Sequence, residues 1–344
     1  MRLLVTGGCG FIGANYLYYL FETDPDCVVV NLDKLTYAGN LLSVTPLEER
    51  HGVKHGDGRY VFAHGDIADA ELVTRLVEEH RIEAIVNFAA ESHVDRSIND
   101  PTPFMTTNIL GAQNLLQVAR AMKLERIVHV STDEVYGTLG PDGKFTEATP
   151  LAPNSPYSAS KAAADLLCRA WFHTYNTPVV VTRCSNNYGP FQFPEKLIPL
   201  MITKAKADQP LPVYGDGQNV RDWIYVRDHC RGVDLALRKG TPGEAYNFGG
   251  NAEKTNIDVV KTILTALGKP ESLITYVQDR PGHDRRYAMD YSLAERTLGF
   301  TPEYTFTRGI QETLTWYNQN EEWVASVHSG AYLAFMQQWY GSRI

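Results

Sequence analysis

Short apolar runs recur along the first half of the chain, and longer stretches with apolar residues at helical spacing separate them. The runs are rich in β-branched residues and occupy residues 3–5, 27–32, 60–63, 84–88, 127–130 and 179–182. Strands that alternate with amphipathic helices form parallel sheets whose two faces are both covered. The pattern therefore predicts an α/β domain that binds its ligand at the carboxyl ends of the strands.

Two of the intervening stretches are long enough to form extended helices, at residues 103–122 and 155–175. The second carries Leu166, Leu167 and Ala170 at helical spacing, and the first contains Gly111 as its single weak breaker. One of the two helices is a candidate for a subunit interface.

Proline and glycine become frequent after Thr182, which predicts a second, smaller α/β lobe on the substrate side. Residues 246–249 have the pattern of one more strand. We expect a nucleotide-binding domain at residues 1–185, with residues 224–248 returning to it, and a substrate-binding lobe at residues 186–223 and 249–344. In that lobe Asn256 is a candidate cap for a helix at 257–267, and Gly268 lies just past its end. Residues 44–58 are expected to form an exposed connection without a role.

Composition narrows the class of protein. The 344 residues hold 32 basic and 40 acidic side chains, a formal net charge of -8, so nucleic acid is not an expected partner. The five cysteines are scattered without metal-like pairs, which indicates a reducing compartment, with the cytoplasm as the default, and no metal site. We expect neither a signal peptide nor a membrane span, because no long uninterrupted apolar stretch is present.

The first apolar run leads into a glycine-rich turn at residues 7–13 (GGCGFIG) that opens a predicted helix. Such glycines let the backbone approach a pyrophosphate, which then faces the N-terminus of the helix. Asp33 ends the second run, where a carboxylate accepts hydrogen bonds from ribose hydroxyls and repels a 2'-phosphate. We therefore predict an NAD site in a Rossmann-like, doubly wound sheet. Lys34 weakens the preference for NAD over NADP, and an ordinary turn residue is the alternative interpretation of Asp33.

Two adjacent acids, Asp133 and Glu134, follow Thr132 just past the run at residues 127–130. Neighbouring carboxylates repel each other and are unfavourable to desolvate, so such a pair at the end of a buried strand indicates one acid and one base. A solvated strand-to-loop turn is the alternative.

Tyr157 and Lys161 lie four residues apart on a predicted helix and share one face. A nearby ammonium group lowers the pKa of a phenol, which makes Tyr157 a candidate base for a sugar hydroxyl. A tyrosine and a lysine at this spacing are common by chance. They indicate a catalytic couple here because the glycine turn of a nucleotide site precedes them.

The order of glycine turn, Thr132, Tyr157 and Lys161 resembles the extended short-chain dehydrogenase/reductase superfamily over nearly the whole chain. Shorter motifs are similar to those of its nucleotide-sugar 4,6-dehydratases: residues 35–40 (LTYAGN), 90–96 (AESHVDR), 131–137 (STDEVYG), 185–190 (SNNYGP), 219–223 (NVRDW) and 280–286 (RPGHDRR). Cys9 stands where this family usually has alanine, and we interpret it as a packing residue.

This resemblance implies a hydro-lyase with tightly held NAD that acts on a thymidine diphosphate sugar. Tyr157 would take the proton of the sugar 4-hydroxyl as hydride leaves C4, and Thr132 would hydrogen bond to that oxygen. Glu134 would then remove the C5 proton while Asp133 protonates the departing 6-hydroxyl, and hydride would return to C6. A homodimer formed through the two long helices is also implied.

The resemblance further implies two sets of binding residues. The expected cofactor contacts are Gly7, Gly10, Phe11, Ile12, Gly13, Asp33, Lys34, Thr36, Asp66, Ile67, Ala89, Tyr157 and Lys161. The expected nucleotide-sugar contacts are Ser92, Thr132, Asn186, Glu195, Lys196, Arg221, Asn256, Arg280 and His283. Competing interpretations are surface ion pairs for Arg221 with Asp222 and for Arg280 with Asp279, a helix cap for Asn256, and a structural role for His283. His93, in the motif at residues 90–96, is interpreted as a structural histidine before a functional one.

Other functions remain open for a chain with these motifs. A nucleotide-sugar 4-epimerase needs the glycine turn and the Tyr157/Lys161 couple but no acid pair. A UDP-glucuronate decarboxylase would leave Asp133 idle, and a non-catalytic NAD(P)-sensing protein would need neither acid. A UDP-sugar dehydratase would differ from the expected enzyme in selecting uracil rather than thymine in the substrate. The residues alone do not determine this selectivity. Asp133 is the residue that discriminates best among the reactions.

Overall fold

Seven parallel strands form the large sheet of the computed structural model, which describes residues 1–279 and 283–327. Its order is β10-β6-β5-β4-β1-β2-β3, and every pairing is parallel. The strands are β1 (Arg2–Thr6), β2 (Val28–Asp33), β3 (Tyr60–His64), β4 (Ala84–Asn87), β5 (Arg126–Thr132), β6 (Val179–Cys184) and β10 (Ala245–Phe248). The chain winds outward from β1 to β3 and then from β4 to β10, so the predicted doubly wound, Rossmann-like fold is confirmed.

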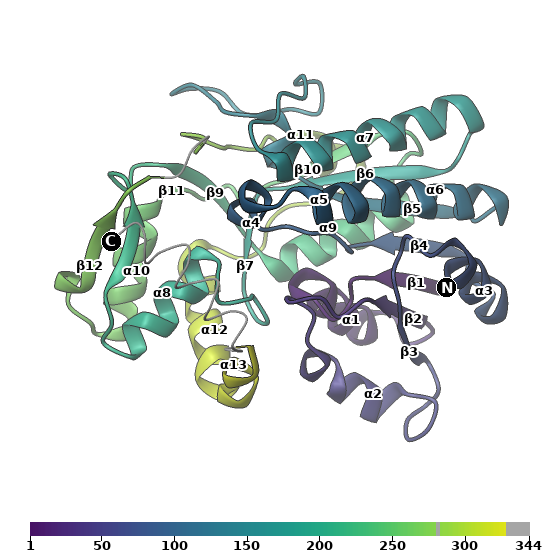
Figure 1. Cartoon of the computed structure of the whole chain (residues 1–344), viewed down its shortest axis with the longest axis horizontal. Coiled ribbons are helices and arrows are strands. Elements are labelled where there is room, and N and C mark those ends of the chain that lie inside the picture. The colour runs from purple at the N-terminus through teal and green to yellow at the C-terminus, as the bar shows by residue number, and fades with distance from the viewer. Residues whose placement is uncertain (280–282, 328–344) are drawn as a thin grey trace.

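Helices cover both faces of this sheet (Figure 1). One face carries α1 (Phe11–Thr23) and α9 (Val226–Lys239), and the other carries α3 (Ala70–His80), α6 (Ala112–Ala121) and α7 (Pro156–Tyr175). Successive strand residues therefore enter different cores: Leu3 and Val5 pack toward α1 and α9, whereas Leu4 between them packs toward α3 and α6. Burial on both faces explains why these strands are continuous apolar runs rather than alternating ones.

The helix predicted at residues 103–122 is interrupted. It begins as α5 (Thr102–Phe104), widens into a π-helical segment, η2 (Met105–Gly111), and continues as α6. The wide turn directs Asn108 inward, where its amide donates to the Glu91 carbonyl and to Ser160 Oγ at 2.9 and 2.8 Å. The interruption thereby fixes the loop after β4 against α7. No helix among the described residues is both long and apolar enough to cross a membrane.

A smaller lobe lies beside the large sheet (Figure 1). It contains a three-stranded sheet, β11-β9-β7, and a pair of strands, β12-β8. Its strands are β7 (Asn186–Tyr188), β8 (Leu211–Tyr214), β9 (Val220–Tyr225), β11 (Glu253–Thr255) and β12 (Ile274–Val277). Its helices include α8 (Leu197–Lys206), α10 (Asn256–Leu267), the short 3-10 turn η4 (Glu271–Leu273) and α12 (Phe306–Gln319).

The chain returns from this lobe to the large sheet, because α9 and β10 follow β9 directly and α11 (Ser292–Leu298) packs beside them. Tyr188, Trp223 and Leu314 belong to the separate core of the smaller lobe. The functional division into an NAD-binding domain and a sugar-binding lobe remains a prediction.

Two local predictions are wrong. Residues 44–58 contain a helix, α2 (Thr45–His51), whose Leu47 is buried in the core of the large domain together with Val44. The apolar residues that anchor this segment are too few for their spacing to stand out in the sequence. The cap of α10 is Thr255, which accepts the N–H of Asp258 at 3.1 Å, and Asn256 is the first helical residue.

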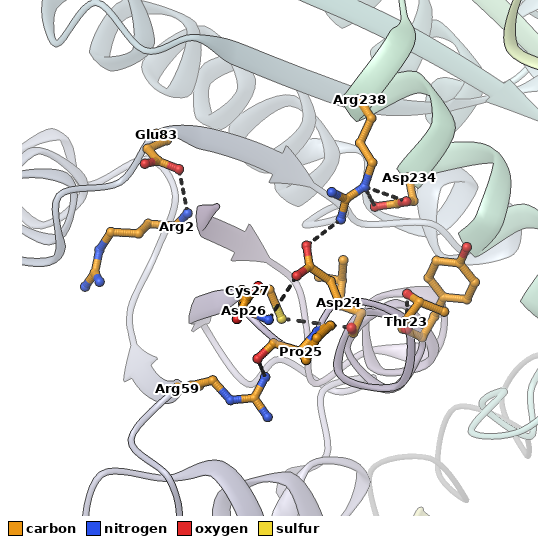
Figure 2. A network of polar contacts seen from close by, with 12 residues as sticks. Arg2, Thr23, Asp24, Pro25, Asp26, Cys27, Arg59, Glu83, Asp234 and Arg238 are labelled. Carbon is orange, nitrogen blue, oxygen red and sulfur yellow. Dashed lines mark hydrogen bonds and ion pairs between the residues drawn. The ribbon is translucent and has the colours of Figure 1, made fainter.

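A network of polar contacts connects the elements at the end of the large sheet where its strands begin (Figure 2). Arg238 on α9 donates to Asp24 at 2.8 Å, just past the end of α1, and also holds Asp234 one turn earlier. Nearby, Arg59 donates to the Pro25 carbonyl at 2.8 Å. These bonds join α1, α9 and the start of β3 at the edge opposite the predicted ligand site.

Candidate active site

The glycine turn between β1 and α1 has no room for side chains. Gly7 has a φ of 73°, and a Cβ there would lie 2.6 Å from the Ala89 backbone nitrogen. A Cβ on Gly13 would lie 2.2 Å from the Gly7 carbonyl oxygen. The N-cap of α1 is Gly10, which offers no side-chain cap, so the first N–H groups of the helix are open to a ligand. A pyrophosphate fits this arrangement because the helix N-terminus attracts negative charge.

Asp33 closes the opposite side of this turn. Its carboxylate accepts the N–H groups of Cys9 and Leu35, both at 2.8 Å, and burial raises its pKa. Each oxygen keeps a second lone pair, which two ribose hydroxyls could use. Lys34 donates to Asp66 at 2.6 Å, so its charge is paired beside the cavity. Because its charge is paired with Asp66, Lys34 gives less reason to expect NADP in place of NAD.

A cavity of about 280 Å³ opens over the carboxyl ends of the strands. All the predicted cofactor contacts line it, from Gly7 in the glycine turn to Lys161 on α7, and so do Ser92, Thr132, Asp133 and Glu134. Apart from Tyr157 and Lys161 on α7, these residues lie at or after the ends of β1, β2, β3, β4 and β5. They meet because parallel strands present their carboxyl ends at a single edge of the sheet.

The acid pair lies where β5 ends. Thr132 caps a short 3-10 turn, η3 (Asp133–Tyr136), by accepting the Glu134 N–H at 3.3 Å, and its hydroxyl donates to Asp133 Oδ1 at 3.2 Å. Asp133 is 2% exposed, and burial followed by the charge of Glu134 raises its pKa well above the usual range. Glu134 is half-buried. The turn therefore separates the two acids into a buried group with a raised pKa and a more accessible one.

Tyr157 and Lys161 lie on the first turns of α7. Ser155 and Ser158 form a capping box at this end of the helix, with Pro156 as its first residue. Lys161 donates to the Val130 carbonyl at 2.7 Å, and burial lowers its pKa. We expected Lys161 to lower the pKa of Tyr157, but that pKa is raised, first by burial and then by the charge of Glu134. Lys161 lies under the end of β5, and its ammonium group hydrogen bonds to the backbone of that strand.

A second cavity, of about 160 Å³, continues from the first into the smaller lobe. The two cavities share part of their lining: Glu134, Asn186, Asn187, Gln192, Glu195 and Lys196. Arg221, Asn256 and His283 line the second cavity and not the first. Arg280 lies outside the described residues. Glu134 is thus placed at the junction between the predicted cofactor and sugar-nucleotide sites.

Arg221 is buried and its guanidinium donates to the carbonyls of Val220 and Asp284 at 2.8 and 2.9 Å. It also lies 4.2 Å from the centre of the Tyr287 ring. Asp222, the partner in the competing ion-pair interpretation, instead accepts the Ala252 N–H at 2.8 Å. Arg221 is therefore held in place by backbone while it lines the cavity.

Two histidines take part in local structure and also line the second cavity. The ring of His93 accepts the Arg96 N–H at 3.3 Å as the cap of α4 (Val94–Asn99), which supports its structural interpretation. His283 Nδ1 lies 2.6 Å from Asp279 Oδ1, within hydrogen-bond distance.

The sequence interpretation missed Tyr37 and Arg96. Glu195 is buried and accepts from Arg96 at 3.1 Å, and the Arg96 guanidinium lies 3.8 Å from the centre of the Tyr37 ring. Tyr37 comes from the loop after β2, Arg96 from α4 and Glu195 from the loop before α8. Tyr37 and Glu195 line the first cavity, and Arg96 holds Glu195 from behind that lining. The signal was present, since Tyr37 and Arg96 both lie in motifs used for the resemblance.

Several buried polar atoms at these cavities lack a hydrogen-bond partner among the described residues. They are Asp133 Oδ2, Ser185 Oγ, Asn186 Oδ1, Gln192 Oε1 and Trp223 Nε1. Unpaired buried polar groups are rare in folded proteins and need a compensating partner. Their gathering here is typical of a site that receives a polar ligand.

The fold and this site together define a class of protein. A doubly wound sheet, a glycine turn with Asp33, and a Tyr/Lys couple beside a buried acid pair are those of a dinucleotide-dependent enzyme of the extended short-chain dehydrogenase/reductase superfamily. Residues 4–313 match the family model described as GDP-mannose 4,6 dehydratase, and the chain belongs to this family of nucleotide-sugar dehydratases.

Comparison with individual proteins narrows the similarity. The chain is 55% identical to a dTDP-glucose 4,6-dehydratase of Xanthomonas campestris pv. campestris (strain B100), with 96% of each chain covered. A crystal structure of dTDP-glucose 4,6-dehydratase from Bacillus anthracis in complex with NAD is 49% identical, with a TM-score of 0.88 over 95% of this chain and 99% of that one. A UDP-glucose 4-epimerase from Thermotoga maritima, solved with UDP-glucose, has a TM-score of 0.85 at 26% identity over 93% of this chain and all of its own.

Proposed function

We propose that this chain is a dTDP-glucose 4,6-dehydratase, an NAD-dependent hydro-lyase that converts dTDP-glucose to dTDP-4-keto-6-deoxyglucose and water. The observation that carries the proposal is the acid pair: a buried Asp133 with a raised pKa next to the half-buried Glu134, at the junction of two cavities. Elimination of water across C5 and C6 needs one group to take a proton and another to give one. The high identity to curated dTDP-glucose 4,6-dehydratases supports the same activity.

The cofactor is NAD. When bound at this site it would supply reversible hydride transfer between C4 and C6 of the sugar, so no outside oxidant would be needed. Gly7, Gly10 and Gly13 would hold its pyrophosphate and Asp33 its adenosine ribose. Tyr157 is placed to take the proton of the 4-hydroxyl, and the hydroxyl of Thr132 can donate to the oxygen left behind. To act as this base Tyr157 must already be ionised, and its raised pKa makes the phenolate a strong base.

Glu134 and Asp133 then divide the elimination. The C4 ketone acidifies the C5 proton, which Glu134 removes, and a double bond forms between C5 and C6. Asp133 gives its proton to the departing 6-hydroxyl, which leaves as water. After hydride has reached C6, the protonated Glu134 returns a proton to C5. The raised pKa of Asp133 favours its protonated form, as a general acid requires.

The sugar nucleotide would occupy the second cavity. Arg221 suits the diphosphate, because a guanidinium stays charged and offers forked donors to phosphate oxygens. Ser92, Asn186, Glu195, Lys196, Asn256 and His283 supply further polar contacts in this proposal, together with Arg280. Residues 1–185 and 224–248 would bind NAD, and residues 186–223 and 249–344 the nucleotide sugar.

The alternative functions would leave one or both acids of the pair without a role. An epimerase removes and returns hydride at C4 alone and needs no proton donor with the burial of Asp133. A decarboxylase loses carbon dioxide, so a group that protonates a leaving hydroxyl would have no task. A non-catalytic NAD(P)-sensing protein would have no use for two carboxylic acids that face a cavity. Asp133 therefore favours dehydration.

The test is incubation of the purified chain with dTDP-glucose, without added oxidant, followed by alkali. We expect the absorbance that is typical of a 4-keto-6-deoxy sugar. UDP-glucose and GDP-mannose serve as matched substrates and should give much less product. Conversion of UDP-glucose to its 4-epimer, with no product from dTDP-glucose, would contradict the proposal.

We also infer a homodimer that forms through the two long helical segments at residues 102–121 and 156–175. Leu110 and Leu166, on η2 and α7, are 55% and 57% exposed, which is unfavourable for large apolar side chains unless a partner covers them. A reducing compartment such as the cytoplasm is proposed because all five cysteines are buried free thiols.

A further inference from the structure

A buried network of polar side chains connects the helix that carries Tyr157 and Lys161 to the turn that carries Asp133 and Glu134. Its central residue is Arg183 on β6, which is 8% exposed. Its Nε donates to Asp165 Oδ2, and its Nη1 donates to the hydroxyl of Tyr136, both at 2.8 Å. One guanidinium group thus bonds to two different elements.

Each end of the network is attached to the proposed catalytic groups through a short stretch of backbone. Asp165 lies four residues after Lys161 on α7, so the two side chains share one buried face of the helix; burial lowers the pKa of Lys161, and the charge of Asp165 opposes that lowering. Tyr136 is the last residue of η3, which begins at Asp133. Arg183 therefore spans the distance between the two sets of acid-base groups.

The far side of Tyr136 is also fixed. Its hydroxyl donates to Asn247 Oδ1 on β10 at 2.8 Å, and its ring stacks on Phe145 with centres 4.9 Å apart. Neither Arg183 nor Tyr136 lines either of the two cavities. Their contacts are with protein groups rather than with the space where the ligands would lie.

We propose that Arg183 and Tyr136 are positioning residues that hold the Asp133–Glu134 turn in register with Tyr157, so that oxidation at C4 and elimination at C5 and C6 act on one sugar in one pose. This inference rests on the proposed function. Its physical basis is that two separate elements must reach adjacent carbon atoms, and small displacements of a reacting group slow catalysis strongly. Arginine suits this role because its planar fork bonds to two acceptors at once.

The two ends of the network differ in how much else supports them. The long helix α7 packs against β5, β6 and α6, whereas η3 is a four-residue turn. Loss of the Tyr136 hydroxyl should therefore displace Asp133 and Glu134 while Tyr157 stays in place. A purely stabilising ion pair would instead lower the stability of the protein without separating the two partial reactions.

The test compares Tyr136→Phe with Tyr246→Phe in the full-length enzyme loaded with NAD. Tyr246 is a matched control because it is a buried tyrosine on the same strand as Asn247, its hydroxyl accepts the Thr241 N–H at 3.0 Å, and it lines neither cavity. Oxidation at C4 is followed by the absorbance of reduced nicotinamide after rapid mixing with dTDP-glucose. Proton removal at C5 is followed by deuterium uptake from heavy water.

For Tyr136→Phe we expect C5 exchange to slow by about tenfold or more while C4 oxidation stays near its original rate, so reduced cofactor accumulates. Arg183→Lys keeps a positive charge beside Asp165 but removes the fork, and it should show the same imbalance; it also serves as the test if Tyr136→Phe does not fold. Tyr246→Phe should leave the ratio of the two rates unchanged.

Two outcomes would overturn the inference, and they are distinguishable. If the wild-type chain forms no 4-keto-6-deoxy product, the proposed function fails and the positioning role fails with it. If the wild-type chain is active but Tyr136→Phe and Arg183→Lys keep the rate ratio of Tyr246→Phe, the positioning role alone is contradicted.

Discussion

Asp133 and Glu134 are adjacent in the sequence and have similar side chains, yet the fold gives them different surroundings. Asp133 is buried beside the first cavity alone, where burial raises its pKa, and Glu134 borders both cavities. The sequence predicted that these two acids form a site, because they follow a buried strand and precede the Tyr157/Lys161 couple. It did not show which acid is protonated, since that depends on burial by residues distant in the chain.

Replacement of Glu134 by glutamine should separate the two halves of the reaction. Because Tyr157 and Thr132 are untouched, Glu134→Gln enzyme should still reduce its bound NAD when dTDP-glucose is added. It should lose exchange of the C5 proton by about 100-fold or more, since an amide does not accept that proton. Mass spectrometry of the sugar after incubation in heavy water measures the exchange, and normal exchange would assign the base to another residue.

Replacement of Asp133 by asparagine should stabilise the folded protein at neutral pH although it impairs catalysis. Below about pH 4 the carboxyl is protonated in both folded and unfolded chains, so its burial has little effect on stability. As the pH rises, the unfolded chain ionises while the folded chain holds its proton, and stability is lost until the raised pKa is reached.

Asp133→Asn removes this loss, so its free energy of unfolding at pH 7 should exceed that of the wild type. Thermal or urea unfolding between pH 4 and 8 measures the difference, which should shrink toward the acid end. A difference that grows as the pH falls would contradict the raised pKa.

At the scale of elements, the strands were predictable and the irregular segments were not. Every strand of the large sheet lies within a residue or two of its predicted place, because burial on both faces makes a continuous apolar signal. The π-helical turn at η2 and the short helix α2 left no such signal. Both depend on contacts with distant residues, as Asn108 does through Glu91 and Ser160.

A further element that the sequence did not suggest is α13 (Glu321–Val327). Trp323 donates to Ser43 Oγ at 2.9 Å, and Asn40 donates to Ser326 Oγ at 2.7 Å. Trp323 and Phe193 also pack with Tyr37 and Ala38, which line the proposed cofactor cavity. The helix therefore supports the loop after β2 from outside.

Removal of this support should weaken cofactor binding. We expect Trp323→Ala to raise the dissociation constant of NAD by about tenfold, equivalent to about 1.4 kcal/mol, because the loop that bears Tyr37 loses its packing. Trp171→Ala is the matched control, since Trp171 lies on α7 away from both cavities. Calorimetric titration of cofactor-free protein measures the affinity; equal affinities in the two variants would contradict the role of α13.

At the scale of the whole molecule, the remaining question is how the exposed apolar residues of the long helices are covered. Leu166→Glu should convert the proposed dimer to a monomer, because a charged side chain in the middle of an apolar interface would be buried without a partner. Tyr276→Glu is the control: Tyr276 is 59% exposed on β12 of the smaller lobe and should not affect assembly. Light scattering of the purified proteins gives the mass, and a monomeric wild-type chain would contradict the dimer.

The sequence by itself determined the class of fold and the glycine turn with Asp33, because these follow from local spacing and from strands whose composition reflects burial on both faces. The set of candidate site residues came from the family resemblance. The tertiary structure decided the rest. It placed Glu134 where two cavities meet, raised the pKa of Asp133 by burying it, placed Lys161 on the Val130 carbonyl, and joined α7 to η3 through Arg183. Burial and long-range hydrogen bonds depend on residues far apart in the chain, and these set the charge and position of each group.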